Sequence, residues 1–329
     1  MVAKSGPPAA RQPAPLSPTP LYAILMKAMI LGRNGQLGWA LERRLHGQPG
    51  LIALGRGELD LADAGAVAAA VESACPQVVF NAAAYTAVDR AETDRDAAFA
   101  VNARAPEALA AACARVGAIL VHYSTDYVFD GSKAGRWVET DPTGPLSVYG
   151  ESKLAGEQAL AASPCASVVL RTSWVYGDHG ANFAKTMLRL ATERDALRVV
   201  SDQHGTPTWA GRLAEVSESI ARQALQSADA VGWLGERRGV YHASAAGETN
   251  WTEYARCVLS VAQDLPPWAG RLKVLAPQVE PIPSSAYPVP ARRPQNSLLD
   301  CGRLARTFGC AMPDWRGDVE AYVRRLAAA

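Results

Sequence analysis

Ala28-Met-Ile-Leu-Gly32-Arg-Asn-Gly35-Gln-Leu-Gly38 is the segment from which the architecture of this chain can be predicted. Its first four residues are apolar and predict a short buried strand, and residues 39–45 continue as an amphipathic helix. The glycines between them let the backbone turn tightly and approach a pyrophosphate, to which the helix N-terminus offers free N–H groups. Such a turn predicts a dinucleotide site, and the residues expected to contact the cofactor are Gly32, Arg33, Asn34, Gly35, Gln36, Leu37 and Gly38.

Short apolar runs alternate with helical segments further along the chain. The runs expected to form strands are 51–54, 77–80, 118–121, 167–171 and 239–242. This alternation predicts an α/β fold, a doubly wound parallel sheet of the Rossmann type with a smaller, loop-rich C-terminal substrate-binding lobe. We expect the first and fourth strands to flank the point where the strand order reverses, so that the fourth strand faces the glycine turn.

The chain is expected to divide into a leader, a cofactor domain and a lobe. Residues 26–176 plus about 209–245 would form the NADP-binding domain, and about 177–208 plus 246–329 the nucleotide-sugar-binding lobe. Residues 1–25 are rich in Pro, Ala and Ser without a sustained apolar segment, which predicts a disordered leader rather than a secretory signal. Met26 directly precedes the first strand, so translation could instead begin there.

Composition excludes several classes of function. The formal net charge is +1 without a long basic run, and no apolar run approaches the ~20 residues that span a bilayer, so neither nucleic acid nor membrane is expected as a partner. The six cysteines are scattered, and no CxxC or Cys/His cluster occurs. This pattern predicts neither a metal site nor a disulfide framework, and it is typical of a reducing cytoplasm.

The residues after the second strand bear on the choice of cofactor. An NAD-preferring site often has an acidic residue there, whereas this chain has Arg56, and Arg33 lies inside the glycine turn. Two guanidinium groups near the ribose would suit a 2′-phosphate, so we expect NADPH, with NADH an acceptable alternative. Both arginines could also be solvated surface residues. Asp63 is expected to cap the next helix. Further expected cofactor contacts are Asp60, Leu61, Ala82, Ala83, Ala84 and Tyr85.

Tyr149 and Lys153 are the candidate catalytic pair. They are four residues apart in a helix-forming segment, which places both on one helical face. An ammonium one turn away favours the phenolate, so the pKa of the tyrosine should fall below its usual ~10 and make the phenol a proton donor near neutrality. An isolated pair of this kind is more often two exposed residues at a helix entry. Here the glycine turn and Ser124-Thr125, after the fourth strand, favour a catalytic role, although such a Ser-Thr pair is also typical of a helix cap.

Eight segments together carry a resemblance to a known family. They are 32–38, 81–89, 123–129, 149–153, 171–176, 182–190, 202–208 and 293–297. Over residues 26–326 the chain resembles the extended short-chain dehydrogenase/reductase superfamily and, within it, the dTDP-4-dehydrorhamnose reductase family. The glycine turn and the Tyr149 segment are generic to the superfamily. Ser-Thr-Asp-Tyr-Val-Phe, Arg-Thr-Ser-Trp-Val-Tyr and Asp-Gln-His-Gly-Thr-Pro-Thr are far more specific.

The resemblance implies reduction of dTDP-6-deoxy-L-lyxo-4-hexulose to dTDP-L-rhamnose, a precursor of cell-envelope polysaccharides such as O-antigen. The nicotinamide would deliver hydride to C4 of the sugar, and Tyr149 would protonate the developing alkoxide. Lys153 would hold the nicotinamide ribose and depress the pKa of the tyrosine, and Thr125 would donate a hydrogen bond to the C4 oxygen. Ser124 would contact the cofactor. The residues implied to contact the substrate are Thr125, Asp126, Tyr127, Trp174, Asn182 and Arg293.

The resemblance also implies a cytoplasmic homodimer. Some members hold Mg²⁺ at the dimer interface, but no metal ligand can be assigned in this sequence. Two alternatives remain: a reductase, epimerase or dehydratase acting on another nucleotide sugar, and a non-catalytic regulatory subunit on the same fold. Tyr127 stands where a dehydratase would have Glu after Thr125-Asp126, and the intact Thr125, Tyr149 and Lys153 favour an enzyme.

Overall fold

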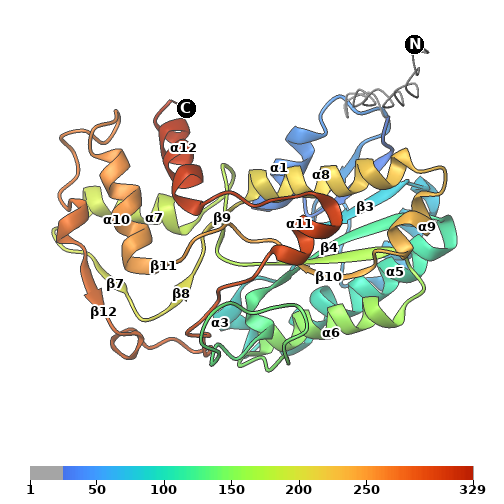
Figure 1. Ribbon diagram of the computed structural model, residues 1–329, viewed down its shortest axis with the longest axis horizontal. Coiled ribbons are helices and arrows are strands. Elements are labelled where there is room, and N and C mark those ends of the chain that lie inside the picture. The colour runs from blue at the N-terminus through green and yellow to red at the C-terminus, as the bar shows by residue number, and fades with distance from the viewer. Residues whose placement is uncertain (1–24, 329) are drawn as a thin grey trace, which may run out of the picture.

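Six parallel strands form the central sheet of the computed structural model, which describes residues 25–328 (Figure 1). Their order is β10-β5-β4-β3-β1-β2. The strands are β1 (Ala28–Leu31), β2 (Ile52–Leu54), β3 (Val78–Asn81), β4 (Ile119–Thr125), β5 (Ser167–Thr172) and β10 (Gly239–His242). The predicted doubly wound α/β fold is confirmed. The leader predicted for residues 1–25 falls, apart from Leu25, outside the described residues.

The strand neighbouring β1 differs from the prediction. β1 pairs with β2 at one edge and with β3 at the other, where Ala28 lies opposite Val78 and Leu31 opposite Asn81. Both hydrogen-bonding edges of β1 are therefore occupied, and β4 pairs with β3 instead. The expectation that the fourth strand flanks the reversal point is wrong, and Ser124 lies one strand further from the glycine turn.

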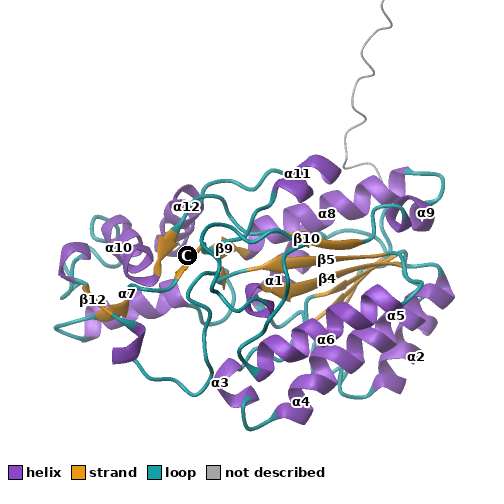
Figure 2. Ribbon diagram, turned by 60° about the horizontal axis from the view of Figure 1, so that its bottom comes forward, coloured by secondary structure: helices purple, strands orange, loops and turns teal. Residues whose placement is uncertain are grey.

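Helices cover both faces of the sheet, as Figures 1 and 2 show. β1 alternates its buried side chains between the two faces, with Ile30 in one apolar cluster and Met29 in the other. On the Ile30 face lie α1 (Gln36–Arg44), α8 (Ala210–Gln226), α9 (Ala230–Gly235) and α11 (Gly302–Phe308). On the Met29 face lie α2 (Ala64–Ala74), α5 (Ala105–Val116) and α6 (Val148–Ala162). Because helices cover both faces, the strands consist mainly of buried apolar residues, with polar residues such as Asn81, Thr125 and Thr172 at their carboxyl ends.

Short elements complete the region after β3. They are α3 (Val88–Ala91), α4 (Arg95–Phe99), a π-helical turn η2 (Ala100–Arg104) and, after β4, a 3₁₀ turn η3 (Asp126–Val128). Asp63 caps α2 by accepting a hydrogen bond from the Ala66 N–H, as expected. Thr125 likewise caps η3 by accepting from the Tyr127 N–H.

The C-terminal lobe packs around a core of its own, on the left in Figure 1. Its helices are α7 (Phe183–Glu193), α10 (Trp251–Ala262) and α12 (Trp315–Ala327). Short strands and turns surround them: β6 (Val175–Tyr176), β7 (Arg198–Val200), β8 (His204–Gly205), β9 (Thr208–Trp209), β11 (Thr249–Asn250), η4 (Ala276–Gln278), β12 (Glu280–Ile282) and η5 (Ser284–Ala286). Helices α10 and α12 were missed in the sequence, where this segment was expected to be rich in loops. α11 packs against the sheet with α8, although its position in the sequence suggested the lobe.

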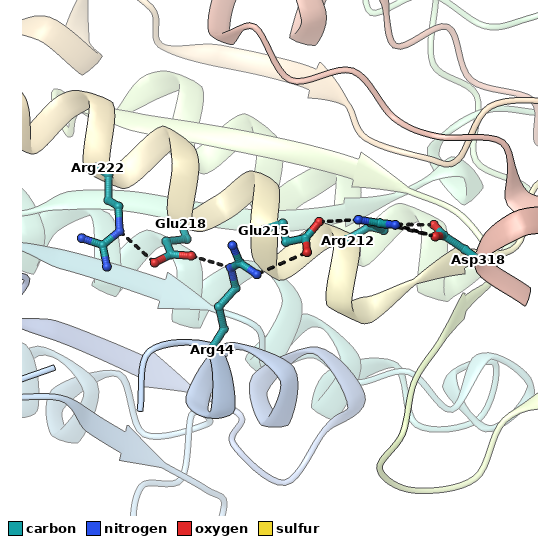
Figure 3. Close-up of polar contacts among 6 residues, drawn as sticks. All are labelled: Arg44, Arg212, Glu215, Glu218, Arg222 and Asp318. Atoms are coloured by element: carbon teal, nitrogen blue, oxygen red, sulfur yellow. Dashed lines mark hydrogen bonds and ion pairs between the residues drawn. The ribbon is translucent and has the colours of Figure 1, made fainter. Parts of the chain in front are cut away.

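A row of ion pairs runs along α8 and links the two parts of the fold (Figure 3). Arg212 of α8 pairs with Asp318 of α12 at 3.0 Å. It also pairs with Glu215, at 2.8 Å, which in turn contacts Arg44 of α1 at 3.3 Å. The row continues through Glu218, which contacts Arg44 and Arg222. The helix after the glycine turn is thus connected to the lobe through α8.

None of the helices between residues 25 and 328 is both long and apolar enough to cross a membrane.

Candidate active site

A cleft of about 620 Å³ opens at the carboxyl ends of the central strands. Many of the residues predicted from the sequence line it. These are Gly32, Asn34, Gly35, Gln36, Leu37, Arg56, Asp60, Leu61, Ala82, Ala83, Ala84, Tyr85, Ser124, Tyr149 and Lys153. The cleft therefore brings the glycine turn and the Tyr149–Lys153 pair together. A wider depression on the lobe, lined by His204, Arg256 and Arg316, contains none of the predicted site residues.

The glycine turn is held in a shape that only small residues allow. Gly32 has a φ of +86°, and a Cβ placed there would lie 2.7 Å from the backbone of Ala83. A Cβ on Gly38 would overlap the carbonyl oxygen of Gly32, so Gly38 packs against the turn rather than lining the cleft. α1 begins after Gly35 without a side-chain cap. The N–H groups of its first turn are thus available to an anion.

The two arginines proposed for the 2′-phosphate have different surroundings. Arg33 pairs with Glu42 at 2.7 Å and with Glu58 at 3.6 Å, and it donates to the Ala53 carbonyl. These contacts engage its guanidinium and Arg33 is not among the residues that line the cleft, so its contact with the cofactor stays a prediction. Arg56 is exposed and does line the cleft. Of the two arginines, Arg56 alone lines the cleft.

Tyr149 and Lys153 both lie in the first turns of α6, which Ser147 caps by accepting a hydrogen bond from the Gly150 N–H. Lys153 is almost fully buried, and its Nζ lies 2.6 Å from the Tyr123 carbonyl oxygen and 3.3 Å from Nε2 of His122. Burial lowers the pKa of Lys153 to about 8. Burial raises the pKa of Tyr149, only partly offset by the nearby Thr125 hydroxyl.

The expected depression of the tyrosine pKa by Lys153 is therefore wrong. The lysine directs its ammonium at acceptors on β4, and desolvation dominates the pKa of the phenol. A phenol with a raised pKa remains protonated at neutral pH.

Thr125 and Asp126 lie just behind the cleft lining. The Thr125 hydroxyl donates to Oδ1 of Asp126 at 3.0 Å. Asp126 is buried, and this burial raises the pKa of its carboxyl to about 6. The Thr125 hydroxyl would have to rotate away from Asp126 in order to donate to a substrate oxygen.

Arg293 reaches back from the C-terminal segment to the mouth of the site. Its Nη2 pairs with Asp89 of α3 at 2.7 Å, and its Nη1 donates to the Tyr127 hydroxyl at 3.1 Å. The Tyr127 ring meets Tyr149 edge to face, with the ring centroids 5.5 Å apart. Arg293 and Tyr127 are thus joined to the catalytic tyrosine, although neither lines the cleft itself.

The remaining two predicted substrate residues have mainly structural contacts. Trp174 stacks on Trp251 with ring centroids 3.7 Å apart, and it adopts a φ of +47°, a conformation that non-glycine residues rarely occupy. Asn182 caps α7 through Lys185 N, and its Nδ2 donates to the Gly177 carbonyl and the Tyr322 hydroxyl. Its Nδ2 also lies 3.3 Å from Oε1 of Gln36, which lines the cleft, so Asn182 connects α7 to the cleft lining and its contact with the substrate stays a prediction.

Several cleft residues were not predicted. Thr172, at the end of β5, lines the cleft, as do Arg90 of α3 and Asp94, the residue before α4. Thr172 could have been found by the rule that identified Ser124, because it also follows the carboxyl end of a sheet strand. Arg90 and Asp94 form an i,i+4 ion pair at 3.5 Å, and Asp94 accepts from the Tyr85 hydroxyl. Only their four-residue spacing was visible in the sequence.

No group of three His, Cys, Asp or Glu side chains within residues 25–328 is arranged to hold a metal ion. The Mg²⁺ site implied by the resemblance therefore finds no fitting donor set among these residues.

A dinucleotide-type turn and a tyrosine–lysine pair in one cleft of a Rossmann fold define the class of a nicotinamide-dependent oxidoreductase. Comparison with known proteins agrees. Residues 26–328 match the family described as RmlD substrate binding domain. The dTDP-4-dehydrorhamnose reductase of Burkholderia thailandensis is 46% identical over 301 residues, which cover 92% of this chain and 99% of that protein.

Solved structures give the same result. A dTDP-4-dehydrorhamnose reductase from Clostridium acetobutylicum superposes with a TM-score of 0.81 at 35% identity, covering 92% of this chain and 99% of that one. The Bacillus anthracis dTDP-4-dehydrorhamnose reductase in complex with NADP has a TM-score of 0.80 at 33% identity, with 91% and 99% covered. The chain belongs to the dTDP-4-dehydrorhamnose reductase family.

Proposed function

We propose that this protein uses NADPH to reduce the C4 keto group of dTDP-6-deoxy-L-lyxo-4-hexulose (dTDP-4-dehydrorhamnose), forming dTDP-L-rhamnose in the last step of dTDP-rhamnose synthesis. The observation that carries this proposal is that Tyr149 and Lys153 line the same cleft as the glycine turn. The name shared by relatives over nearly the whole chain supports the choice of substrate.

The residues of the cleft fit a nicotinamide dinucleotide. The uncapped start of α1 would bind its pyrophosphate, and Ala82–Ala84 leave room for the cofactor to lie against the backbone. Arg56 would pair with a 2′-phosphate, which favours NADPH, and NADH would bind without that contact. The Bacillus anthracis relative was solved with NADP, which supports the same choice.

Tyr149 is the proton donor in this proposal. The bound nicotinamide supplies hydride to C4 of the sugar, and the carbonyl oxygen becomes an alkoxide that must gain one proton. The phenol of Tyr149 remains protonated because burial raises its pKa, and it gives that proton to the alkoxide. Lys153, which lines the cleft, would hold the nicotinamide ribose through its remaining N–H donor. The Thr125 hydroxyl, once rotated from Asp126, donates to the C4 oxygen as charge builds there.

The nucleotide part of the substrate would bind between the cleft and the lobe. Arg293 would exchange its partner Asp89 for a phosphate of the sugar nucleotide, beside Tyr127. Trp174, supported by Trp251, offers an aromatic face to the base. A homodimer, a cytoplasmic location and a role in O-antigen synthesis stay predictions.

The proposal is tested by generating the keto sugar from dTDP-glucose with the preceding dehydratase and epimerase and following NADPH consumption. We expect oxidation that requires the protein, the keto sugar and NADPH together, with dTDP-L-rhamnose as the product. A folded protein that binds NADPH but leaves this sugar unreduced would contradict the proposal, and would favour another keto sugar or a regulatory subunit.

A further inference from the structure

Lys153 is held by two acceptors on β4. Its Nζ contacts the Tyr123 carbonyl oxygen at 2.6 Å and Nε2 of His122 at 3.3 Å, and the side chain is 2% exposed. A lysine ammonium has three N–H donors and no acceptor. Two of these donors meet the protein, and one is left for the cleft that Lys153 lines. The positions of the two acceptors therefore set the direction of the third donor.

His122 must accept a hydrogen bond from the Lys153 ammonium. The ring is 1% exposed, and burial together with the nearby Lys153 charge holds the pKa of His122 well below its usual value. A neutral imidazole has one N–H donor and one acceptor nitrogen. Because the ammonium can only donate, Nε2 is the acceptor and the ring proton lies on Nδ1.

Asn81 is the partner of the other ring nitrogen. It ends β3 directly opposite His122 in the parallel ladder, and its Nδ2 lies 3.0 Å from Nδ1 of His122. Its Oδ1 is buried without a hydrogen-bond partner. A half-turn of the amide, whose two ends have nearly the same shape, brings Oδ1 to the Nδ1–H. Asn81 can thus select the tautomer that leaves Nε2 free for Lys153.

We propose that His122, fixed in its Nδ1–H tautomer by Asn81, is a positioning residue that holds the Lys153 ammonium and aims its free N–H donor into the cofactor cleft. The proposal deepens the proposed function and rests on it, because the lysine serves the reductive step. Neither His122 nor Asn81 was among the residues predicted from the sequence.

The pKa of Lys153 gives the expected pH dependence. Burial lowers it to about 8, and Glu157 of α6, itself paired with Arg171 of β5, raises it. Asp126 and Tyr127 act on the neighbouring Tyr149 rather than on the lysine. A function that needs the ammonium is present below this pKa and is lost as the pH rises through it. Loss of the His122 acceptor would destabilise the ammonium and lower its pKa further.

The test compares His122→Leu, which removes the acceptor, with His122→Gln, which returns an amide oxygen near the place of Nε2. For His122→Leu we expect kcat to fall about ten- to a hundredfold, the usual effect of losing a hydrogen bond to a charged group. The KM for the sugar should change little, and the alkaline limb of the pH profile should move down by about one pH unit. His122→Gln should recover most of both effects.

His242 provides the matched control. It is also buried, lies on β10, and contacts the Trp137 carbonyl at 3.1 Å, outside the cleft. His242→Leu should lower the thermal midpoint as His122→Leu does, but it should leave the alkaline limb in place. A wild-type pH profile in folded His122→Leu, or an equal shift in His242→Leu, would overturn the proposal.

A second readout needs no substrate and no variant at His122. Nitrogen-15 NMR of the labelled imidazoles should show the proton of His122 on Nδ1 at neutral pH, and Asn81→Leu should weaken that preference, because only the Lys153 ammonium would then favour it. A proton on Nε2 in the wild-type protein would overturn the proposal. Because this measurement is independent of turnover, it separates failure of the positioning role from failure of the proposed reaction.

Discussion

Tyr149 is the residue on which the proposed chemistry depends most. Its pKa is raised by burial rather than lowered by Lys153, which suits a group that must carry a proton until an alkoxide forms. The tyrosine and the lysine could be predicted from their four-residue spacing and from the glycine turn and the Ser124-Thr125 pair that accompany them in the sequence. The direction of the pKa shift could not, because it depends on how deeply tertiary packing buries the phenol.

Tyr149→Phe should reduce kcat by about two to four orders of magnitude, since only the proton donor is lost. The affinity for NADPH, measured by fluorescence titration, should stay within about twofold of the wild-type value, because no binding group is removed. The control is Tyr241→Phe on β10, which removes a hydroxyl that donates to the Arg237 carbonyl, and Tyr241 is not among the residues that line the cleft. Wild-type turnover by Tyr149→Phe would rule out this proton donor.

Arg56 and Arg33 offer a second comparison at the residue scale. Arg56→Ala should weaken NADPH binding about tenfold and leave NADH binding almost unchanged, because only the former carries the 2′-phosphate. Arg33→Ala should alter neither affinity, since its guanidinium is engaged by Glu42 and Glu58. Calorimetric titration of both variants with both cofactors checks this. Equal loss of both affinities in Arg56→Ala would contradict the assignment.

At the scale of elements, local sequence patterns predicted where the strands lie in the chain, but not which strands pair with each other in the sheet. β1 and β10 have the predicted bounds. A short run of this kind between two helical segments is too short for a helix and is typical of a buried strand. The order of the strands depends on which edge of the sheet the chain returns to after each helix. No local sequence pattern determines this choice. Helix α10 was missed because the proline-dense residues that follow it obscured its amphipathic pattern, although Asn250 caps it by accepting from Glu253 N.

The contact between the glycine turn and α1 gives a prediction at this scale. Gly38→Ala should lower the free energy of unfolding by about 1–3 kcal/mol and weaken NADPH binding, because its methyl group would overlap the Gly32 carbonyl. The matched control is Gly317→Ala in α12, where an added Cβ meets nothing within 4 Å. That change should stabilise the protein by up to about 1 kcal/mol. Chemical denaturation measures both, and an unaffected Gly38→Ala would contradict the packing described.

At the scale of the whole molecule, α8 carries the connection between the cofactor domain and the lobe. Its ion-pair row reaches α1 at one side and α12 at the other (Figure 3). The row joins α1 to α8 and α8 to α12, through residues that are more than a hundred positions apart in the sequence. Side-chain pairs of such separation could not be predicted from one sequence.

Asp318→Ala should lower the free energy of unfolding by about 1–3 kcal/mol, because the buried end of the pair with Arg212 is lost. Glu320→Ala, on the same helix, removes an exposed pair with Arg324 and should cost at most about 1 kcal/mol. Denaturant titration of the two variants gives the comparison. Equal losses would show that the row does not stabilise the junction with the lobe.

The central claim is that this cleft transfers hydride from the nicotinamide to C4 of the keto sugar while Tyr149 supplies the proton. The most direct test is turnover with NADPH deuterated at the transferable position, followed by NMR of the isolated product. The account predicts dTDP-L-rhamnose with deuterium at C4 alone, formed about two to four orders of magnitude more slowly by Tyr149→Phe. Product without deuterium at C4, or labelled product from Tyr149→Phe at the wild-type rate, would contradict it.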